Sequence, residues 1–502
     1  CYKITTTKSG SRTSKFANCN FSMRIKNSVS LIAIYCLLTG AFELHAQVHM
    51  GNGIKIGEVD SDSAIIWTRL TSHPERTTDG HSFDLVTKDA KKQPIYEDLS
   101  VMNGSVVGQL GSVKVTYWPK NKKSLRRTTK WQPVHQKSSR RSTTWQPVYS
   151  RNDYTHQFKL KNLESGTAYA LLVEGKRNDA NCRLKGGFRT APKMDQASDI
   201  RFVVTTCGEY PRRDDPVNGH KIYPQMLALD PDFFVHTGDI EYYDKPGPFA
   251  KNIDLARFKW NRIYATPYLR TFHNQVSSYF IKDDHDTLKD DAWPGQNYFD
   301  LTWEQGLATF REQVPMGDKT YRTLRWGKDL QIWLVEGRDY RSPNNMPDGP
   351  EKSIWGTVQK QWFFDTVSAS DATFKVLLSP TPIVGPDRLK KNDNHSNKGF
   401  THEGDELRRF IAAQENLYIV CGDRHWQYAS IDPKTGAREF SCGPGSDNHS
   451  GGYWEEFRND MHRFLRVKGG FLSVDINSAA SKITFQHHSV DGSVQNQESF
   501  TK

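Results

Sequence analysis

The feature that most constrains the fold is an alternation of short apolar runs and polar clusters between residues 200 and 425. The apolar runs are only a few residues long and nearly continuous, which favours strands buried on both faces. A helical stretch separates the first two, and in such strand–helix–strand layouts ligands bind beyond the carboxyl ends of the strands. The sequence therefore predicts an α/β layered enzyme, with a helix near 221–229 and strands at 200–206, 232–236, 278–281, 330–335, 374–378 and 417–421.

Four polar clusters directly follow predicted strands. They are Thr-Cys-Gly-Glu at 206–209, Gly-Asp-Ile-Glu-Tyr at 238–242, Asp-Asp-His-Asp at 283–286 and Gly-Asp-Arg-His at 422–425. One Gly-Asp after a strand is an ordinary turn, but four clusters that each supply a carboxylate, imidazole or thiolate are harder to explain in that way. Convergent ligands from several strand ends are what a two-metal hydrolytic site requires.

Ligand chemistry suggests a role for each metal-binding candidate. Asp239 can bridge two cations with its two oxygens, and Tyr242 can face the same ion if the chain coils between them. A phenolate together with the thiolate of Cys207 suits a highly charged, oxidised metal, so we expect iron as Fe³⁺. Asp284, Asp423 and His425 complete the predicted ligands, and an oxygen-rich half can hold calcium.

Several other polar residues can be interpreted in two ways. His285 beside a predicted ligand can stabilise charge on a transferring phosphoryl group or protonate the leaving oxygen. Arg338 and Arg341 can clamp a phosphate, or can pair with neighbouring acids. Taken alone, Cys207 is more often a buried small hydrophobe and Tyr242 a packing residue. His395 is expected to lie in a polar loop rather than bind metal, and the pair His487 and His488 to lie at the surface.

The order Thr-Cys-Gly, Gly-Asp-x-x-Tyr, Asp-Asp-His-Asp and Gly-Asp-Arg-His resembles the alkaline phosphatase D family of metallophosphoesterases. Segments 339–341 and 354–362 are similar to further landmarks of that family, and the resemblance runs from about residue 54 to 490. It implies an α/β/α-layered catalytic domain and a secreted phosphomonoesterase or phosphodiesterase with Fe³⁺ and Ca²⁺. In that reading a metal-bound hydroxide attacks the phosphorus of a phosphate ester.

The resemblance also implies site residues, and the sequence departs from the pattern in places. By motif, Cys207, Asp239 and Tyr242 bind the iron with Asp423 and His425 nearby, Asp284 replaces a metal-binding Asn, and His285 matches the catalytic His. Asp290 and Asp291 stand where the family often has an Asn, and 378–382 lacks the His that the wider superfamily places after a later strand. The basic insertion 116–151 is not a family feature.

The chain's net charge of +11 comes from two short segments. Residues 1–46 carry +5 and residues 116–151 carry +10, so the remainder carries −4. A basic run of this kind is more often a solvated loop than a contact for a polyanion or an anionic surface. Binding to nucleic acid is therefore not expected.

The first 46 residues are interpreted as an upstream extension and a signal peptide. Met23 opens a basic stretch, the apolar run 29–38 is too short to span a bilayer comfortably, and Ala46 is a small residue before Gln47. We expect a secreted or periplasmic protein with no stable membrane insertion after signal cleavage; a retained membrane anchor is the alternative. One disulfide is permitted in that compartment, and Cys421–Cys442 is the candidate.

The remaining organisation follows from strand patterns. Residues 47–192 are predicted to form a fibronectin-like β-sandwich, with strands at 54–56, 64–68, 154–160 and 169–173. A catalytic domain over 198–490 follows, closing in a hairpin at 470–485, and 491–502 is a tail. Inside the insertion, 126–134 and 140–148 repeat each other, which indicates a duplicated loop. Trp131 and Trp145 in that repeat leave one other function open: a non-enzymatic carbohydrate- or surface-binding protein.

Overall fold

The structure is a computed structural model that describes residues 47–83, 88–120, 140–388 and 390–502. One mixed sheet of nine strands contains the strands that precede three of the polar clusters. Its centre is parallel, and antiparallel strands flank that centre on both sides. Its order is β23 (Val494–Thr501), β22 (Lys482–His488), β21 (Phe471–Asn477), β9 (Ile200–Thr205), β10 (Phe233–His236), β11 (Ser277–Phe280), β1 (Ile54–Gly57), β2 (Ala64–Arg69) and β6 (Thr155–Leu160).

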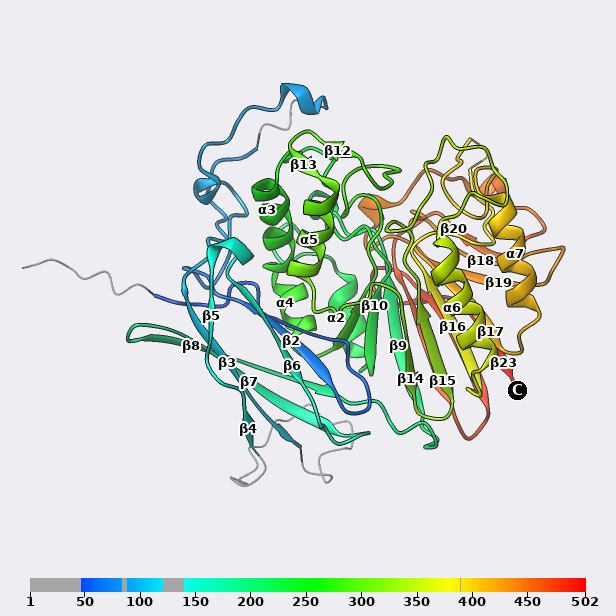
Figure 1. The fold of residues 1–502 in the computed structure, drawn as a ribbon, viewed down its shortest axis with the longest axis horizontal. Coiled ribbons are helices and arrows are strands. Elements are labelled where there is room, and N and C mark those ends of the chain that lie inside the picture. Colours follow the sequence, from blue (N-terminus) through cyan, green and yellow to red (C-terminus); the bar gives the residue numbers. More distant parts are fainter. Residues whose placement is uncertain (1–46, 84–87, 121–139, 389) are drawn as a thin grey trace, which may run out of the picture. The chain divides into compact units, whose positions relative to one another are not determined.

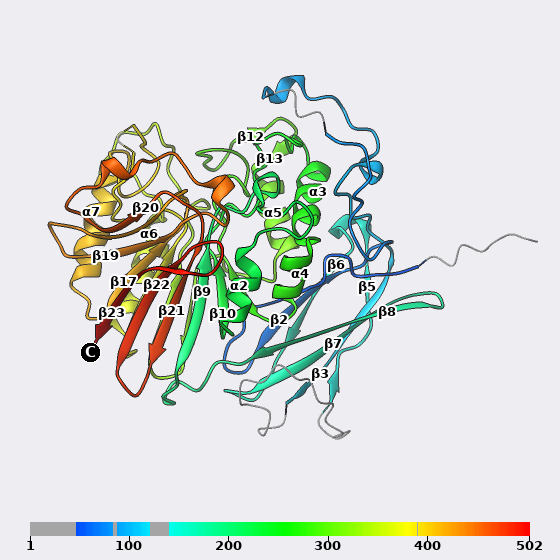
Figure 2. The same cartoon turned by 180° about the vertical axis from the view of Figure 1, so that it is seen from behind.

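A second mixed sheet of seven strands faces the first (Figures 1 and 2). Its parallel centre includes the strand before the fourth cluster. Its order is β14 (Arg322–Trp326), β15 (Leu330–Leu334), β16 (Phe374–Ser379), β17 (Leu417–Cys421), β19 (Arg438–Cys442), β18 (Gln427–Ile431) and β20 (His462–Arg466).

Helices cover the outer face of each of these sheets. On the nine-stranded sheet lie α2 (Ile222–Ala228), α3 (Ile253–Tyr264), α4 (Pro267–His273) and α5 (Trp303–Gln313); on the seven-stranded sheet lie α6 (Gly356–Ser368) and α7 (Thr401–Ala412). Local sequence sets some of their ends: a capping box between Thr302 and Gln305 begins α5, and the side chain of Asn252 caps α3. Short elements complete this part: β12 (Asn297–Tyr298), β13 (Leu301–Thr302), η6 (Tyr210–Arg212), η7 (Asp447–His449) and η8 (Glu455–Phe457).

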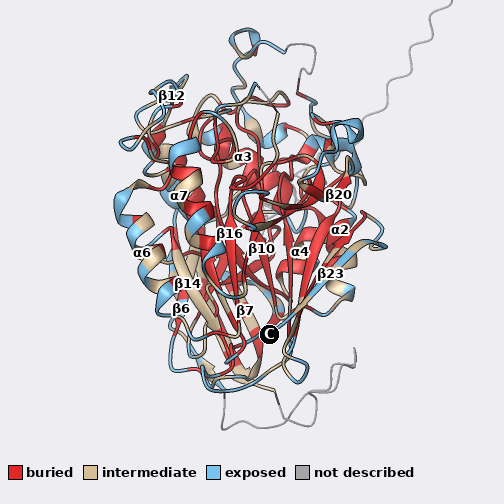
Figure 3. Ribbon diagram, turned by 90° about the vertical axis from the view of Figure 1, so that its right-hand side faces the viewer, coloured by how far each residue is buried: buried red, intermediate tan, exposed pale blue. Residues whose placement is uncertain are grey.

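The prediction of three layers is wrong, because two sheets rather than one lie between the helices. Successive side chains of a strand point to opposite faces. In β9, Phe202 and Val204 pack into the core between the sheets, whereas Val203 packs against the helices. A continuously apolar strand cannot show in its sequence whether the layer that covers it is a helix or a second sheet. Figure 3 shows the result, with buried strands at the centre and helices that expose their outer sides.

Every strand and the helix predicted from sequence are present, yet the strands between residues 54 and 189 are arranged differently. Strands β1, β2 and β6 join the nine-stranded sheet, with Ile56 of β1 beside Ser277 of β11 in a parallel pair. They pack face to face on a third sheet, which gives sandwich-like packing, but one sheet of the pair continues into the sheet of β9–β11. That third sheet contains β4 (Arg141–Ser142), β3 (Gly111–Pro119), β7 (Ala168–Arg177) and β8 (Ala180–Arg189), and β5 (Gln146–Val148) pairs with β3. The boundary at 192 stays a prediction.

Two further expectations about this chain are corrected. The 491–502 segment is not a free tail, because β23 forms the edge of the nine-stranded sheet. The second copy of the repeat is not a loop, since β4 and β5 pair with β3, and its Trp145 ring lies under the ammonium groups of Lys114 and Lys176.

The signal peptide, the first repeat copy and Trp131 lie outside the described residues. Within the described residues, no helix has the length and apolar character needed to cross a bilayer.

The candidate disulfide is not formed, and the prediction that two histidines lie at the surface is wrong. Cys421 and Cys442 are free thiols, and Cys442 Sγ donates to the carbonyl of Cys421 at 3.6 Å. Cys421 lies opposite Ser441 in the parallel pair of β17 and β19, so Cys442 points to the other face. His487 and His488 are buried in β22, where their rings contact the Ser441 carbonyl and the Ser473 hydroxyl. An apolar face can accept a neutral imidazole once its nitrogens have partners.

Candidate metal centre

The four polar clusters meet at one place because of sheet topology. Clusters 206–209, 238–242 and 283–286 follow the parallel neighbours β9, β10 and β11, whose carboxyl ends share one edge of the sheet. Cluster 422–425 follows β17 of the seven-stranded sheet. A hydrogen bond joins the ends of the two sheets, since the Asp423 amide donates to Thr206 Oγ1 at 3.3 Å. Residues from both sheets therefore line a single site.

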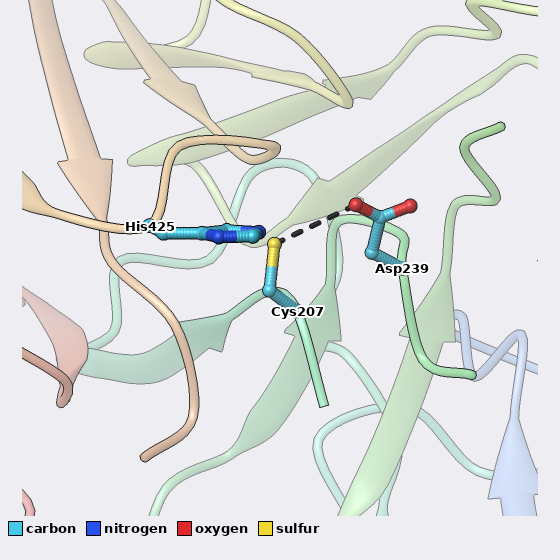
Figure 4. A group of neighbouring side chains, drawn as sticks. All are labelled: Cys207, Asp239 and His425. Atoms are coloured by element: carbon cyan, nitrogen blue, oxygen red, sulfur yellow. Dashed lines mark hydrogen bonds between the residues drawn. The ribbon is translucent and has the colours of Figure 1, made fainter. Parts of the chain in front are cut away.

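One group of ligand atoms contains sulfur, nitrogen and oxygen. The ligand atoms of Cys207, Asp239 and His425 lie within 4.8 Å of one another, as Figure 4 shows. Cys207 Sγ lies 3.7 Å from Asp239 Oδ2. The Tyr242 hydroxyl is 3.2 Å from that same oxygen and 3.1 Å from His425 Nε2. Cys207, Asp239 and Tyr242 are buried and His425 is half-buried, so these four side chains converge out of water.

Asp239 belongs to two further groups that are richer in carboxylates. One contains Asp284 and His285, and the other contains Asp283 and Asp423, again with ligand atoms within 4.8 Å of one another. Five of the six predicted metal ligands lie in these groups, with Asp239 common to three of them, and the sixth, Tyr242, contacts Asp239 and His425. A fourth group links Asp284 to Asp290 and Asp291.

The backbone at these residues adopts conformations that non-glycine residues rarely take. The φ angle is +51° at Cys207, +58° at Asp239 and +63° at Asp423. Gly238 precedes Asp239 with φ +108°, and a Cβ there would lie 2.7 Å from the Cβ of Asp283. Unfavourable dihedrals of this kind concentrate at functional sites, where the surrounding fold imposes them. The fold therefore holds these ligands at a cost in local backbone energy.

Two of the buried carboxylates, those of Asp239 and Asp283, are unfavourable in their charged form. Burial and the neighbouring Asp284 raise the pKa of Asp239 well above its usual range, and burial raises the pKa of Asp283 to about 6. Among the described residues, Asp239 Oδ1 and Asp283 Oδ2 are buried without a hydrogen-bond partner. Unpaired buried oxygens are costly unless a cation completes them. The donor set of thiol, phenol, imidazole and carboxylates fits a pair of metal ions.

His285 is held against two acids at the rim of this cluster. Its Nδ1 lies 2.6 Å from Asp244 Oδ1, and its Nε2 lies 3.6 Å from Asp290 Oδ1. Burial disfavours its charged form, but Asp244 and then Asp284 outweigh burial and raise the pKa of His285 well above its usual range. The imidazole therefore keeps a proton that Nε2 can present towards the cluster.

Arg338 contacts the same carboxylates. Its Nε donates to Asp283 Oδ1 at 2.5 Å, its Nη1 donates to the Ala292 carbonyl at 3.2 Å, and its Nη2 lies 3.8 Å from Asp284. Arg338 thus pairs with neighbouring acids, the second of the two roles considered for it from the sequence. Arg341 instead donates from Nε and Nη2 to the amide oxygen Oδ1 of Asn344, and its Nη1 is buried without a hydrogen-bond partner among the described residues.

Two residues at the centre were given no role from the sequence. His449 in η7 is buried, with its ring 4.3 Å from that of His425 and its Nδ1 3.1 Å from the Cys207 carbonyl. It follows no predicted strand, so spacing could not reveal it. Arg424 was part of a recognised motif, and its guanidinium pairs with Asp423 and, at 2.9 Å, with Asp387.

His395 lies apart from the centre. It is in none of the metal-ligand groups among the described residues, and its Nε2 contacts Glu403 at 2.9 Å. It lies in the loop between β16 and α7, where its side chain is fully buried.

Comparison with known proteins places this geometry in a family. Residues 202–468 match the model of the PhoD-like phosphatase family. A solved structure described as the structure of PhoD is similar over 90% of each chain, with 15% identity and a TM-score of 0.66. The purple acid phosphatase PPD1 from seeds of yellow lupin, Lupinus luteus, is similar over 89% of this chain and 74% of its own, with 13% identity and a TM-score of 0.59.

No curated protein matches the chain. The two structural likenesses concern the fold, whereas the family model spans more than half of the sequence and all four polar clusters. The chain belongs to the PhoD-like phosphatase family and is a phosphoric ester hydrolase.

Proposed function

We propose that the protein is a metal-dependent phosphoesterase that hydrolyses phosphate monoesters, diesters or both outside the cytoplasm. The observation that carries the proposal is the position of Asp239, whose carboxylate is shared by a group containing sulfur and nitrogen and by groups dominated by oxygen. Two unlike sets of donors around one bridging carboxylate favour two unlike cations. The location rests on the sequence of residues 23–47 alone.

The two cations would be Fe³⁺ and Ca²⁺. Cys207, Tyr242 and His425 would hold the iron with Asp239, since thiolate and phenolate suit an oxidised metal. Asp284 and Asp423 would hold calcium, which prefers oxygen ligands. When bound, such ions would neutralise phosphoryl charge and make a nucleophilic water available at neutral pH.

Two residues of the chain would serve the reaction without binding metal. Protonated His285 would place its Nε2 proton near the phosphoryl group, where it can stabilise charge or be given to the leaving oxygen. Arg338 would act as a positioning residue, because its hydrogen bond to Asp283 and its proximity to Asp284 fix both carboxylates. Its Nε and Nη1 already donate to the protein, which favours this role over a clamp on the substrate.

The test is hydrolysis of a chromogenic phosphate monoester and diester by the mature protein and by Asp239→Asn, each supplied with iron and calcium. We expect the variant to lose turnover almost completely while keeping its circular dichroism spectrum, because the bridging charge is gone. Asp254→Asn, an exposed acid on α3, is the matched control and should keep full activity. Unchanged turnover in Asp239→Asn would refute the proposal. The monoester-to-diester ratio would narrow the substrate class.

A further inference from the structure

A pair of exposed aromatic rings lies on the loop that follows the metal centre's His449. Trp454 is 54% exposed and Phe457 is 52% exposed, and their ring centroids are 5.3 Å apart. Of the exposed aromatic side chains in the described residues, these are the two whose rings contact each other. We name this pair the aromatic shelf. Exposed aromatic surface of this kind can stack on planar rings.

Backbone contacts tether the aromatic shelf to the metal centre. The amide of Gly451 donates to the carbonyl of His425, a predicted ligand, at 3.1 Å. Just before it, the ring of His449 packs 4.3 Å from that of His425. Trp454 is three residues beyond Gly451, so its Cα lies within about 11 Å of that glycine even if the chain is fully extended. The shelf is therefore tethered within a few residues of a backbone contact to His425.

Side-chain packing fixes the loop from its other side. Tyr453 stacks on Trp426, the residue after His425, with centroids 4.6 Å apart and planes at 13°. The guanidinium of Arg388 lies 5.9 Å from the same Trp426 ring. Its nearest carboxylate, that of Asp387, is 3.7 Å away, and its buried Nε has no hydrogen-bond partner among the described residues. A cation with one unpartnered donor, Nε, therefore lies beside the Trp426 ring on which Tyr453 of this loop stacks.

We propose that the aromatic shelf binds a planar ring in the leaving group of the substrate, while Arg388 contacts an anionic oxygen. This inference rests on the proposed function and names the substrate class: phosphate esters of alcohols that carry an aromatic ring, such as nucleosides. Water attacks phosphorus, the bond from phosphorus to the alcohol oxygen breaks, and that oxygen takes up a proton. The ring stays outside the reacting bonds, so the shelf sets specificity and leaves the chemistry to the centre.

The test compares adenosine 5′-phosphate with ribose 5-phosphate, which has the same primary alkyl ester and carries a hydroxyl in place of the base. Released phosphate is measured for the metal-supplied protein. We expect a kcat/KM at least about tenfold higher for the nucleotide, since stacking of a base on one aromatic side chain contributes on that order. Trp454→Ala should remove most of this preference and leave ribose 5-phosphate within twofold of the unmodified protein. Trp454→Phe should largely retain it.

Tyr149→Ala is the matched control, because Tyr149 is an aromatic side chain of similar exposure between β5 and β6. Three results would overturn the shelf while leaving the phosphoesterase intact: equal kcat/KM for the two esters, equal losses for both in Trp454→Ala, or hydrolysis of a chromogenic ester alone. No hydrolysis of any ester by the metal-supplied protein would instead overturn the proposed function.

Discussion

At the scale of single residues, the contact between His285 and Asp244 links the candidate catalytic histidine to an acid outside the metal-ligand groups of the described residues. Asp244 is not in the metal-ligand groups found among the described residues, yet its Oδ1 lies 2.6 Å from His285 Nδ1. A carboxylate in that position fixes which nitrogen carries the proton and how the ring is oriented. The geometry therefore assigns Asp244 a positioning role that acts through His285.

Asp244→Asn should lower kcat by about 10- to 100-fold, because an amide keeps a contact to Nδ1 but loses the charge that holds the imidazolium. If His285 protonates the leaving oxygen, the loss should be larger for an alkyl phosphate than for a nitrophenyl phosphate, whose leaving group needs no proton. Steady-state kinetics on both esters measure this. Bound iron and calcium, measured by elemental analysis, should match the unmodified protein; a parallel loss of metal would show a ligand-holding role instead.

Single residues also show what the sequence could and could not reveal about the site. Cys207, Asp239 and His425 were recognisable because each follows an apolar run directly, and parallel strands bring such positions together. Asp244 and His449 were not, because their contacts depend on how loops fold back over the strand ends. Arg338 was recognised as functional, but only its contacts distinguish a clamp on substrate from a partner for Asp283.

At the scale of elements, α6 and α7 are joined by a buried carboxylate. Glu403 in the first turn of α7 accepts the amide of Ile354 at 2.6 Å and the hydroxyl of Ser353 at 2.5 Å, both just before α6, and its Oε2 contacts His395. Burial alone would raise the pKa of Glu403, but these hydrogen bonds and His395 outweigh it and lower the pKa to about 2. The ionised carboxylate thus ties the two helices that cover the seven-stranded sheet.

Glu403→Gln should reduce the free energy of unfolding at pH 7 by about 1–3 kcal/mol, the usual worth of buried hydrogen bonds to a charged group. A folded-state pKa below the ordinary 4.5 stabilises the fold above pH 4.5, and that contribution is lost as the pH falls from 4.5 towards 2. The difference between variant and unmodified protein should therefore shrink across that window. Urea unfolding at several pH values measures it. Glu406→Gln, at a half-exposed pair with Lys360, should change stability little.

At the scale of the whole molecule, individual strands were predictable and their partners were not. The strand Phe374–Ser379 is buried on both faces, and its sequence does not show which layer packs on each face. The second sheet between the helix layers therefore appeared only in the structure. So did the continuity of β1 with β11, since pairing between residues 56 and 277 leaves no local signal. For the same reason, the pairing of β23 with β22 could not be predicted from residues 494–501 alone.

The two large sheets meet at the candidate metal centre, which links metal binding to the stability of the fold. Cys207 and Asp239 follow strands of the nine-stranded sheet, whereas Asp423 and His425 follow β17 of the seven-stranded sheet. Ions held by all four would cross-link the sheets and cancel repulsion among buried carboxylates. A ligand that binds only the folded state at a hundred times its Kd adds about 2.7 kcal/mol.

Removal of metal by chelation should therefore lower the midpoint of thermal unfolding, by about 3 °C or more for a chain of this size. Adding back iron and calcium should restore it, and calorimetry with and without chelator measures the change. Asp239→Asn should melt at nearly the same temperature in both conditions, because its bridging charge is absent, whereas Asp254→Asn should respond as the unmodified protein does. A full response in Asp239→Asn would mean that the stabilising ions bind elsewhere, since a cross-link through the centre requires the carboxylate that its three ligand groups share.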